Sequence, residues 1–206
     1  FELTGSDIVF FVKLIVSRLH KLSPSQLIQT AWCMCVFHVQ QKDTAKSDRL
    51  FDLIELLLVS SQPIEARGKD TGLHPKARVQ LYQIYLYLGE RLSHAKKWFN
   101  KRTIEACHNS FHIDQGQKDE FRALLLPKSY QAFGNRFLSV ERNYRLPTSS
   151  SERSGFHIPF AMVNKQTNKA VLLATEWFEG LFPLVTENQG ERILKEALIK
   201  KHSDCH

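Results

Sequence analysis

The side chains with the clearest chemical use in this sequence are basic and lie between residues 76 and 102. This stretch holds a single acidic residue, Glu90, and its basic residues are Lys76, Arg78, Arg91, Lys96, Lys97, Lys101 and Arg102. Ammonium and guanidinium groups bind phosphate oxygens, so the stretch predicts contact with the backbone of a nucleic acid. The alternative is a solvated helix face, with Trp98 and Phe99 packed in the core instead of stacked on a base.

The sequence contains weaker indications of a metal site or of a nucleophilic residue. His108 and His112 are one helical turn apart, but no acidic third ligand follows in register. The cysteines form no Cys-x-x-Cys pair, which is typical of reduced thiols in a reducing compartment; they are Cys33, Cys35, Cys107 and Cys205. The sequence therefore predicts no catalytic residue, no metal site and no cofactor.

The composition is that of a globular protein with a basic excess. The chain has 206 residues, of which 43% are hydrophobic and 24% charged, and its net charge is +7; these values exclude a disordered or fibrous protein. Residues 1–146 hold 21 Lys and Arg against 14 Asp and Glu, whereas residues 147–206 hold seven of each. The excess lies in the first part and favours an acidic partner such as RNA. Residues 22–41 lack charges but include Pro24 and several polar side chains, so we expect no transmembrane helix.

The first 146 residues are predicted to form an antiparallel helical array of about six helices. The strongest local signal is Ser23-Pro24-Ser25-Gln26, a capping box with proline at the first helical position. That helix places a set of residues on one apolar face: Leu27, Ala31, Met34 and Phe37 or His38. The other predicted helices begin at Ser6 or Asp7, Asp48, Pro75 and Ser93, and two more cover residues 119–125 and 128–142. A polar break is expected over residues 40–47 and a loop over residues 60–74.

The character of the chain changes at Leu146. Residues 147–155 have the Pro, Ser and Gly content of a linker. Two apolar runs of strand length, residues 156–163 and 169–175, flank a polar turn, which indicates a β-hairpin. Pro159 has no backbone N–H to donate, so it favours an edge strand or a bulge over a central strand.

The last segment, residues 190–201, returns to a helical pattern with an apolar side formed by Ile193, Ala197 and Ile199 or Lys200. The predicted domains are therefore a helical array over residues 1–146, a linker over 147–155, and a small α/β unit of hairpin and helix over 156–206. The fold class is mostly α.

Three stretches carry a family resemblance. They are the helix Leu22-Ser-Pro-Ser-Gln-Leu-Ile-Gln-Thr-Ala-Trp-Cys-Met-Cys-Val-Phe37, the tyrosine-containing run Leu81-Tyr-Gln-Ile-Tyr-Leu-Tyr-Leu88, and the order of strand, turn, strand, acidic segment and Lys-containing helix from Phe156 to His202. Together they resemble the RAP proteins, organellar helical-array proteins that include the FAST-kinase-domain group. The resemblance implies RNA handling in a mitochondrion, with a plastid as the alternative, and a C-terminal unit similar to a truncated restriction-endonuclease core.

A catalytic core of that type needs carboxylates that hold Mg²⁺ and a lysine close behind them. This sequence departs from the pattern. Pro159 stands where the first Asp is expected, and Glu176 and Glu179 are each followed two residues later by an apolar residue instead of Lys. Lys195 lies one helix later. These departures from the family pattern favour a protein without nuclease activity.

The favoured interpretation is a non-catalytic RNA-binding protein, a structural component of the mitochondrial ribosome that contacts rRNA and neighbouring proteins and does not insert into a membrane. One alternative is an organellar RNA-processing or stability factor, including an RNA endonuclease of RAP type. The other is a protein-only scaffold in a larger complex. Because the chain begins at Phe1 rather than Met, we expect it to be a fragment or a processed product.

Overall fold

The computed structural model describes residues 4–61, 72–88, 91, 101–125, 138–145, 157–167, 170–172 and 189–202. These residues are mostly helical, as the sequence predicts, with a small antiparallel sheet. The chain divides into two compact units. The helical unit comprises residues 1–111 and 189–201, and the sheet unit comprises residues 112–188 and 202–206. None of the described helices is long and apolar enough to cross a bilayer.

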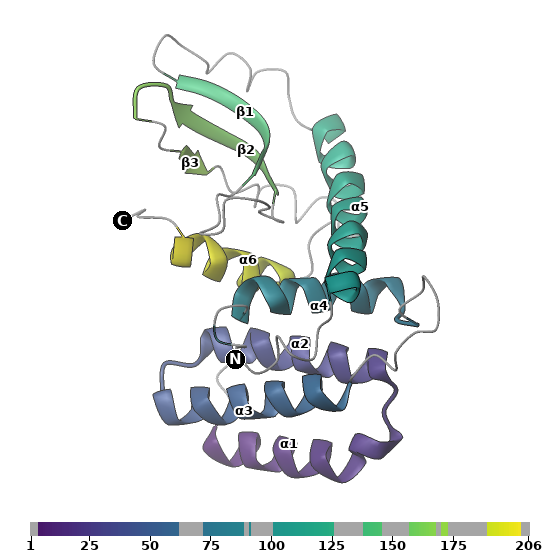
Figure 1. Cartoon of the computed structure of the whole chain (residues 1–206). Helices are drawn as coiled ribbons and strands as arrows, with labels where there is room; N and C mark the ends of the chain where they lie inside the picture. Colours follow the sequence, from purple (N-terminus) through teal and green to yellow (C-terminus); the bar gives the residue numbers. More distant parts are fainter. Residues whose placement is uncertain are drawn as a thin grey trace. The chain divides into compact units, whose positions relative to one another are not determined.

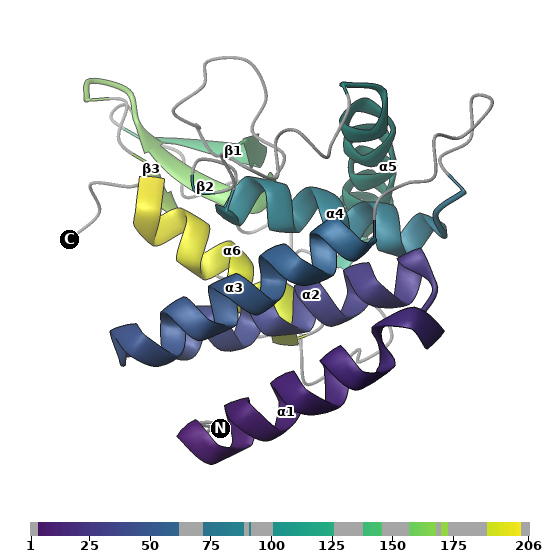
Figure 2. The same cartoon turned by 60° about the horizontal axis from the view of Figure 1, so that its bottom comes forward.

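The helices of the helical unit lie in a layered stack. In this stack α1 packs on α3, α3 on α2, and α2 on α4, as Figure 1 shows, and Figure 2 shows the same helices with the bottom of Figure 1 turned forward. The elements are α1 (Gly5–Arg18), the short 3-10 helix η1 (Leu19–Lys21), α2 (Pro24–Gln40), α3 (Thr44–Ser60), α4 (Pro75–Leu88), α5 (Lys101–Leu125) and α6 (Gln189–His202). The first turns of α5, as far as Phe111, belong to this unit.

Helix α2 begins at the residue that the sequence predicts. The Gln26 side chain accepts a hydrogen bond from the Ser23 backbone N–H (2.9 Å), and Ser23 Oγ accepts one from the Gln26 N–H (3.4 Å). Both bonds satisfy N–H groups that have no partner inside the helix. The predicted capping box is therefore confirmed.

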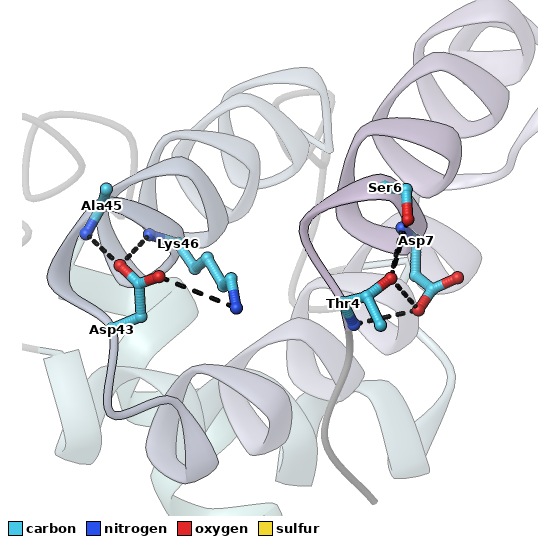
Figure 3. Close-up of polar contacts among 6 residues, drawn as sticks. All are labelled: Thr4, Ser6, Asp7, Asp43, Ala45 and Lys46. Carbon is cyan, nitrogen blue, oxygen red and sulfur yellow. Dashed lines mark hydrogen bonds and ion pairs between the residues drawn. The ribbon is translucent and has the colours of Figure 1, made fainter.

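Helices α1 and α3 begin earlier than predicted. Thr4, not Ser6 or Asp7, is the N-cap of α1, because Asp7 completes a second capping box with it (Figure 3). Asp43 caps α3 by accepting hydrogen bonds from the N–H groups of Ala45 (3.0 Å) and Lys46 (3.4 Å). The polar residues after position 43 are thus the first turn of a helix, and the predicted break ends four residues sooner than expected.

The core of the unit is built around α2. Its predicted face is confirmed, since Leu27, Ala31, Met34 and His38 are all buried. The facing residues of α3 are also buried: Leu50, Leu53, Ile54, Leu57 and Leu58. On another side of α2, the indole of Trp32 lies directly against Gly190 at the start of α6. Helix α6 therefore packs with the helical array.

This placement corrects two predictions about the last helix. Residues 190–201 were expected to belong to a C-terminal α/β unit, but they pack on α2. The predicted apolar side is also rotated: Leu194 and Leu198 are buried, whereas Ile193 and Ala197 are only partly covered. Adjacent helical positions differ by about 100°. Both sets are apolar, so periodicity alone did not decide between them.

Helix α5 merges two predicted helices. It is continuous from Lys101 to Leu125, where the sequence predicted one helix ending near Cys107 and another over residues 119–125. No proline interrupts this range, and a single internal glycine, Gly116, destabilises a helix by only about 1 kcal/mol. The predicted start at Ser93 lies outside the described residues.

The sheet unit contains β1 (Leu138–Arg145), β2 (His157–Asn164) and β3 (Ala170–Leu172) in the order β1-β2-β3, all antiparallel. The predicted hairpin of β2 and β3 is confirmed. Its turn is fixed by Asn164, whose side-chain oxygen accepts hydrogen bonds from the N–H groups of Gln166 (2.9 Å) and Thr167 (3.2 Å).

Strand β1 corrects the predicted helix over residues 128–142. Residues 138–145 pair with β2 from Leu138 opposite Asn164 to Arg145 opposite His157. Leu138 and Val140 alternate with polar residues, which suits a strand, and the pairing outweighs the helical propensity of the segment. Residues 128–137 lie outside the described part of the chain.

The pairing of β1 with β2 also changes the predicted domain boundary. The two strands come from opposite sides of residues 147–155, which themselves lie outside the described residues. The sheet unit therefore begins before Leu146, and the division at that residue separates two strands of one sheet. The structural division follows residue 111 instead.

Pro159 lies in β2, the middle strand of the order β1-β2-β3, although its sequence context favoured an edge or bulge. The ladder explains how it is tolerated. Strand β3 pairs only with residues 161–163 of β2, and the pairs with β1 pass from Phe160–Arg142 to Ile158–Tyr144 without a pair at Pro159. The sheet therefore continues past Pro159 through the pairs on either side of it.

The contact between Gly190 and Trp32 generates the first prediction. A methyl group at position 190 would lie 2.5 Å from Cη2 of Trp32 and 3.1 Å from Cγ2 of Val36. We expect Gly190→Ala to lower the free energy of unfolding by about 1–3 kcal/mol through overpacking. Urea denaturation followed by circular dichroism measures this loss.

Gly5→Ala is the matched control, because its new methyl group meets only Lys46 Cε at 3.9 Å. This variant should be neutral or slightly stabilising, since alanine is the better helix former. Equal stability of the two variants would contradict the packing of α6 on α2.

Candidate nucleic-acid interface

The structure describes the side chains of four of the predicted basic residues. Lys76 is exposed in the first turn of α4, and Arg78 is partly buried two residues later. Arg91 is exposed three residues after the end of α4, and Arg102 is exposed at the start of α5. Lys101 is the first residue of α5, whereas Lys96, Lys97, Trp98 and Phe99 lie outside the described residues.

Helix α4, which links these positions, is mostly interior. Its buried side chains point in several directions: Ala77, Gln80, Leu81, Tyr82, Gln83, Ile84 and Leu88. One side packs on α2. On another, the ring of Tyr82 lies edge-on to His108 and beside Phe111 of α5, with centroid distances of 5.2 and 5.3 Å. The helix therefore has no continuous basic face, and its two charged residues, Lys76 and Arg78, both lie in its first turn.

The two ends of α4 are well separated. Lys76 lies about 18 Å along the helix from Leu88, the last residue of α4, and Arg91 follows Leu88 by three residues. The two residues also have different neighbours: the charge of Lys76 acts on the thiol of Cys33, and that of Arg91 acts on His38 and Tyr87. The basic stretch is thus contiguous in sequence but divided in space.

Arg78 has a neighbour in the core. Burial raises the pKa of the Cys107 thiol to about 12, and the positive charge of Arg78 opposes this shift. Cys107 is fully buried on α5, and Arg78 is partly covered. The guanidinium of Arg78 therefore lies close to the packing of α4 on α5, whereas Lys76, Arg91 and Arg102 are exposed to solvent.

The charge balance differs between parts of the helical unit. From α1 to α3, six basic residues are matched by five acidic ones: Asp7, Asp43, Asp48, Asp52 and Glu55. From α4 to residue 111, the described basic residues Lys76, Arg78, Arg91, Lys101 and Arg102 meet one acidic residue, Glu105. The largest positive excess among the described residues of this unit, +4, therefore lies between α4 and residue 111, and α6 adds a further +2.

Two hydrogen-bonded groups hold α4 in place. Trp32 Nε1 donates to Gln83 Oε1 at 2.6 Å, and both residues are buried. Farther along α2, His38 is bonded through both ring nitrogens: Nδ1 to Tyr87 Oη (2.9 Å) and Nε2 to Ser47 Oγ (3.0 Å). These bonds tie α4 to α2 at two levels and bring in α3 through Ser47.

The His38 side chain is held in its neutral form. Burial lowers its pKa, Arg91 lowers it further, and Asp48 partly opposes both effects. Burial also raises the pKa of Tyr87 to about 12, so the phenol stays protonated at neutral pH. A serine, a neutral imidazole and a phenol in series are groups that nucleophilic enzymes use. Here His38 is buried, and the series links three helices.

Sequence reasoning missed this His38 network. Its members are nine and forty-nine residues apart, so no spacing motif marks them. The available signal was a histidine on the apolar face of a predicted helix, because a buried imidazole needs partners for its nitrogens.

The structure describes two of the residues that matter for a RAP-type nuclease. Lys195 is buried on α6 in the helical unit, and Pro159 lies in the sheet unit. Glu176 and Glu179 lie outside the described residues. Within the described ranges, no three His, Cys, Asp or Glu side chains come together as metal ligands, and this includes His108 and His112 on α5.

Comparisons of the chain with protein families, with curated proteins and with solved structures found no match. The resemblance to RAP proteins therefore stays a prediction that rests on the motifs quoted above.

The His38 network generates a prediction about pH. Unfolded imidazole has a pKa of about 6.5, and the pKa in the folded protein is lower. The unfolded state therefore binds more protons as pH falls through about 6.5, so folding stability should fall between pH 7 and pH 5. Each pH unit between the two pKa values corresponds to about 1.4 kcal/mol.

Urea denaturation at several pH values tests this dependence. The variant His38→Gln should lose less stability over the same range, because glutamine does not titrate. His20→Gln, which replaces an exposed histidine on η1, should behave as the wild type. An unchanged pH profile in His38→Gln would mean that another group causes the acid lability.

Proposed function

We propose that this chain is a non-catalytic RNA-binding protein of an organelle and a structural component of the mitochondrial ribosome. The observation that carries the proposal is the excess of basic over acidic residues in the first turn of α4, at Arg91 beyond its end, and at the start of α5. Phosphates of rRNA provide the matching negative charge. The proposed contacts are Lys76, Arg78, Arg91, Lys101 and Arg102, together with Lys96 and Lys97 from the sequence.

The mechanism is phosphate binding without base readout. Lys and Arg side chains displace counterions from the RNA backbone, which provides affinity that is independent of sequence. The hydrogen bonds of Gln83 and Tyr87 to α2 hold α4, and with it Lys76 and Arg78, in a fixed position. A fixed spacing of charges selects RNA by its shape.

The proposed organelle and the proposed family both rest on the resemblance to RAP proteins. In this proposal the stacked helices form a solenoid-like array, and the sheet unit is a reduced RAP-like domain. Its net neutral sequence suits contact with neighbouring proteins better than contact with RNA. A mitochondrial address is proposed, and a plastid fits the same residues.

Salt-dependent RNA binding tests the proposed contacts. We expect the double variant Lys76→Gln, Arg102→Gln to bind a structured RNA hairpin more weakly, because two exposed phosphate ligands are lost. The slope of log K against log salt concentration should decrease by about two, one for each lost contact. Fluorescence anisotropy across a salt series measures both quantities.

The matched control is Lys42→Gln, Arg49→Gln, which removes the same charge from exposed residues beside and on α3. This control should keep the slope and most of the affinity of the wild type. Equal losses in both double variants would indicate attraction by net charge alone. Weak binding without a salt slope would favour the protein-only scaffold, and cleavage with added Mg²⁺ or Mn²⁺ would favour the endonuclease.

Sedimentation of organelle lysate separates the ribosomal proposal from the alternative of a free processing factor. A ribosomal component should co-sediment with a ribosomal subunit and crosslink to rRNA through residues 76–102. Crosslinks to precursor transcripts, in fractions without ribosomes, would instead indicate RNA processing.

A further inference from the structure

Helix α1 contains many more large apolar residues than it buries against the rest of the protein. Eight of its fourteen residues are large and apolar, yet Ile8 alone among them is buried. Seven large apolar side chains are exposed among the residues with described side chains, and five of them lie on α1: Val9, Phe10, Phe11, Leu14 and Val16. A helix that is apolar on most sides is normally covered on most sides. The outer face of α1 therefore has the character of an interface.

The exposed residues are ordered around the helix. At 100° per residue, five residues fall within about 100° of arc and form what we name the α1 strip: Asp7, Phe10, Phe11, Leu14 and Arg18. The strip has an apolar centre, in which the rings of Phe10 and Phe11 meet edge to face at 6.0 Å. Phe10 is the most exposed member, at 63%. Asp7 closes one end and Arg18 the other.

We propose that the α1 strip is a two-fold interface between two copies of this chain. Two strips packed antiparallel bring Phe10, Phe11 and Leu14 of both copies together. A two-fold axis midway between Phe11 and Leu14 places Asp7 of one copy beside Arg18 of the second, and the same pair recurs by symmetry. A self-complementary patch of this kind is what an isologous dimer requires.

The charged residues at the two ends of the α1 strip favour a second copy of the chain, rather than a membrane or RNA, as its partner. An anionic membrane or RNA would be attracted by Arg18 but repelled by Asp7, whose carboxyl has a lowered pKa because Thr4 donates hydrogen bonds to it. Both of these bonds go to Oδ2, and Figure 3 shows the other oxygen of Asp7 pointing away from Thr4. The polar residues Ser6, Lys13 and Ser17 follow the strip around the helix, so the apolar surface is too narrow for a bilayer.

Sedimentation equilibrium of the full 206-residue chain, without RNA, measures the dimer. We expect a reversible dimer in the wild type and a dissociation constant at least about tenfold higher in Phe10→Ser. Val16→Ser is the matched control, because Val16 is 46% exposed on the same helix but lies outside the strip. It should dimerise as the wild type. Circular dichroism verifies that both variants remain folded.

Charge reversal tests the pairing of the strip ends. Arg18→Glu and Asp7→Lys should each weaken the dimer at least about tenfold, since each turns two attractions into two repulsions. Mixing the two variants should restore a heterodimer, in which Asp7 meets Arg18 and Lys at position 7 meets Glu at position 18. Lys13→Glu, outside the strip, is the control for a change in net charge.

Three results would overturn the proposal. They are a wild-type chain that is monomeric up to roughly 100 μM, a dimer that Phe10→Ser leaves unchanged, and a mixture of the two charge variants that stays monomeric. Binding of the monomer to anionic vesicles through Phe10 would assign the strip to a membrane surface instead. Because the dimer is measured without RNA, its outcome is independent of the proposed ribosomal role.

Discussion

The burial of the Trp32 indole is the constraint around which the helical unit is arranged. An indole in the interior needs a partner for its N–H and a surface that follows its flat shape. Gln83 of α4 supplies the acceptor, and Gly190 of α6 supplies a backbone without a side chain in the way. One residue of α2 therefore fixes the approach of two other helices, one of them more than 150 positions away in sequence.

The His38 network repeats this arrangement with polar groups at the far end of α2. The imidazole joins α3 through Ser47 and α4 through Tyr87, and the low dielectric of the interior strengthens these bonds. Together with the pair of Trp32 and Gln83, it leaves α4 little freedom to rotate or slide. The structure thus uses buried polar groups to orient the helix whose first turn carries Lys76 and Arg78.

The parts of the fold that the sequence predicts correctly are local. The capping box of Ser23 and Gln26 and the buried face of α2 depend on residues three or four positions apart. The errors depend on distant partners: α6 joins the helical unit because of Trp32, and β1 forms because β2 lies beside it. Neither partner is visible in the pattern of the segment itself.

The prediction of the candidate nucleic-acid interface from the sequence is limited in the same way, by contacts between distant residues. The sequence predicts where basic residues concentrate along the chain, but α4 places the bulk of its own buried residues between Lys76 and Arg91. Only the pairing of α4 with α2 and α5 reveals this division, and that pairing rests on Gln83, Tyr87 and Tyr82. The residues that separate the charges are neutral, so a search for charge alone does not find them.

The separation of the charges bears on what kind of RNA suits the molecule. A span of about 18 Å along α4 is several times the rise of about 3.4 Å between successive nucleotides of a strand. Lys76 and Arg91 therefore do not reach neighbouring phosphates of one strand. In the proposed RNA complex they would contact phosphates that lie far apart in sequence or on two strands, which a folded RNA holds at a fixed distance. An ordered array of helices has an advantage over a flexible basic tail only against such a rigid target. This is the physical reason why the proposal of RNA binding favours a structured RNA.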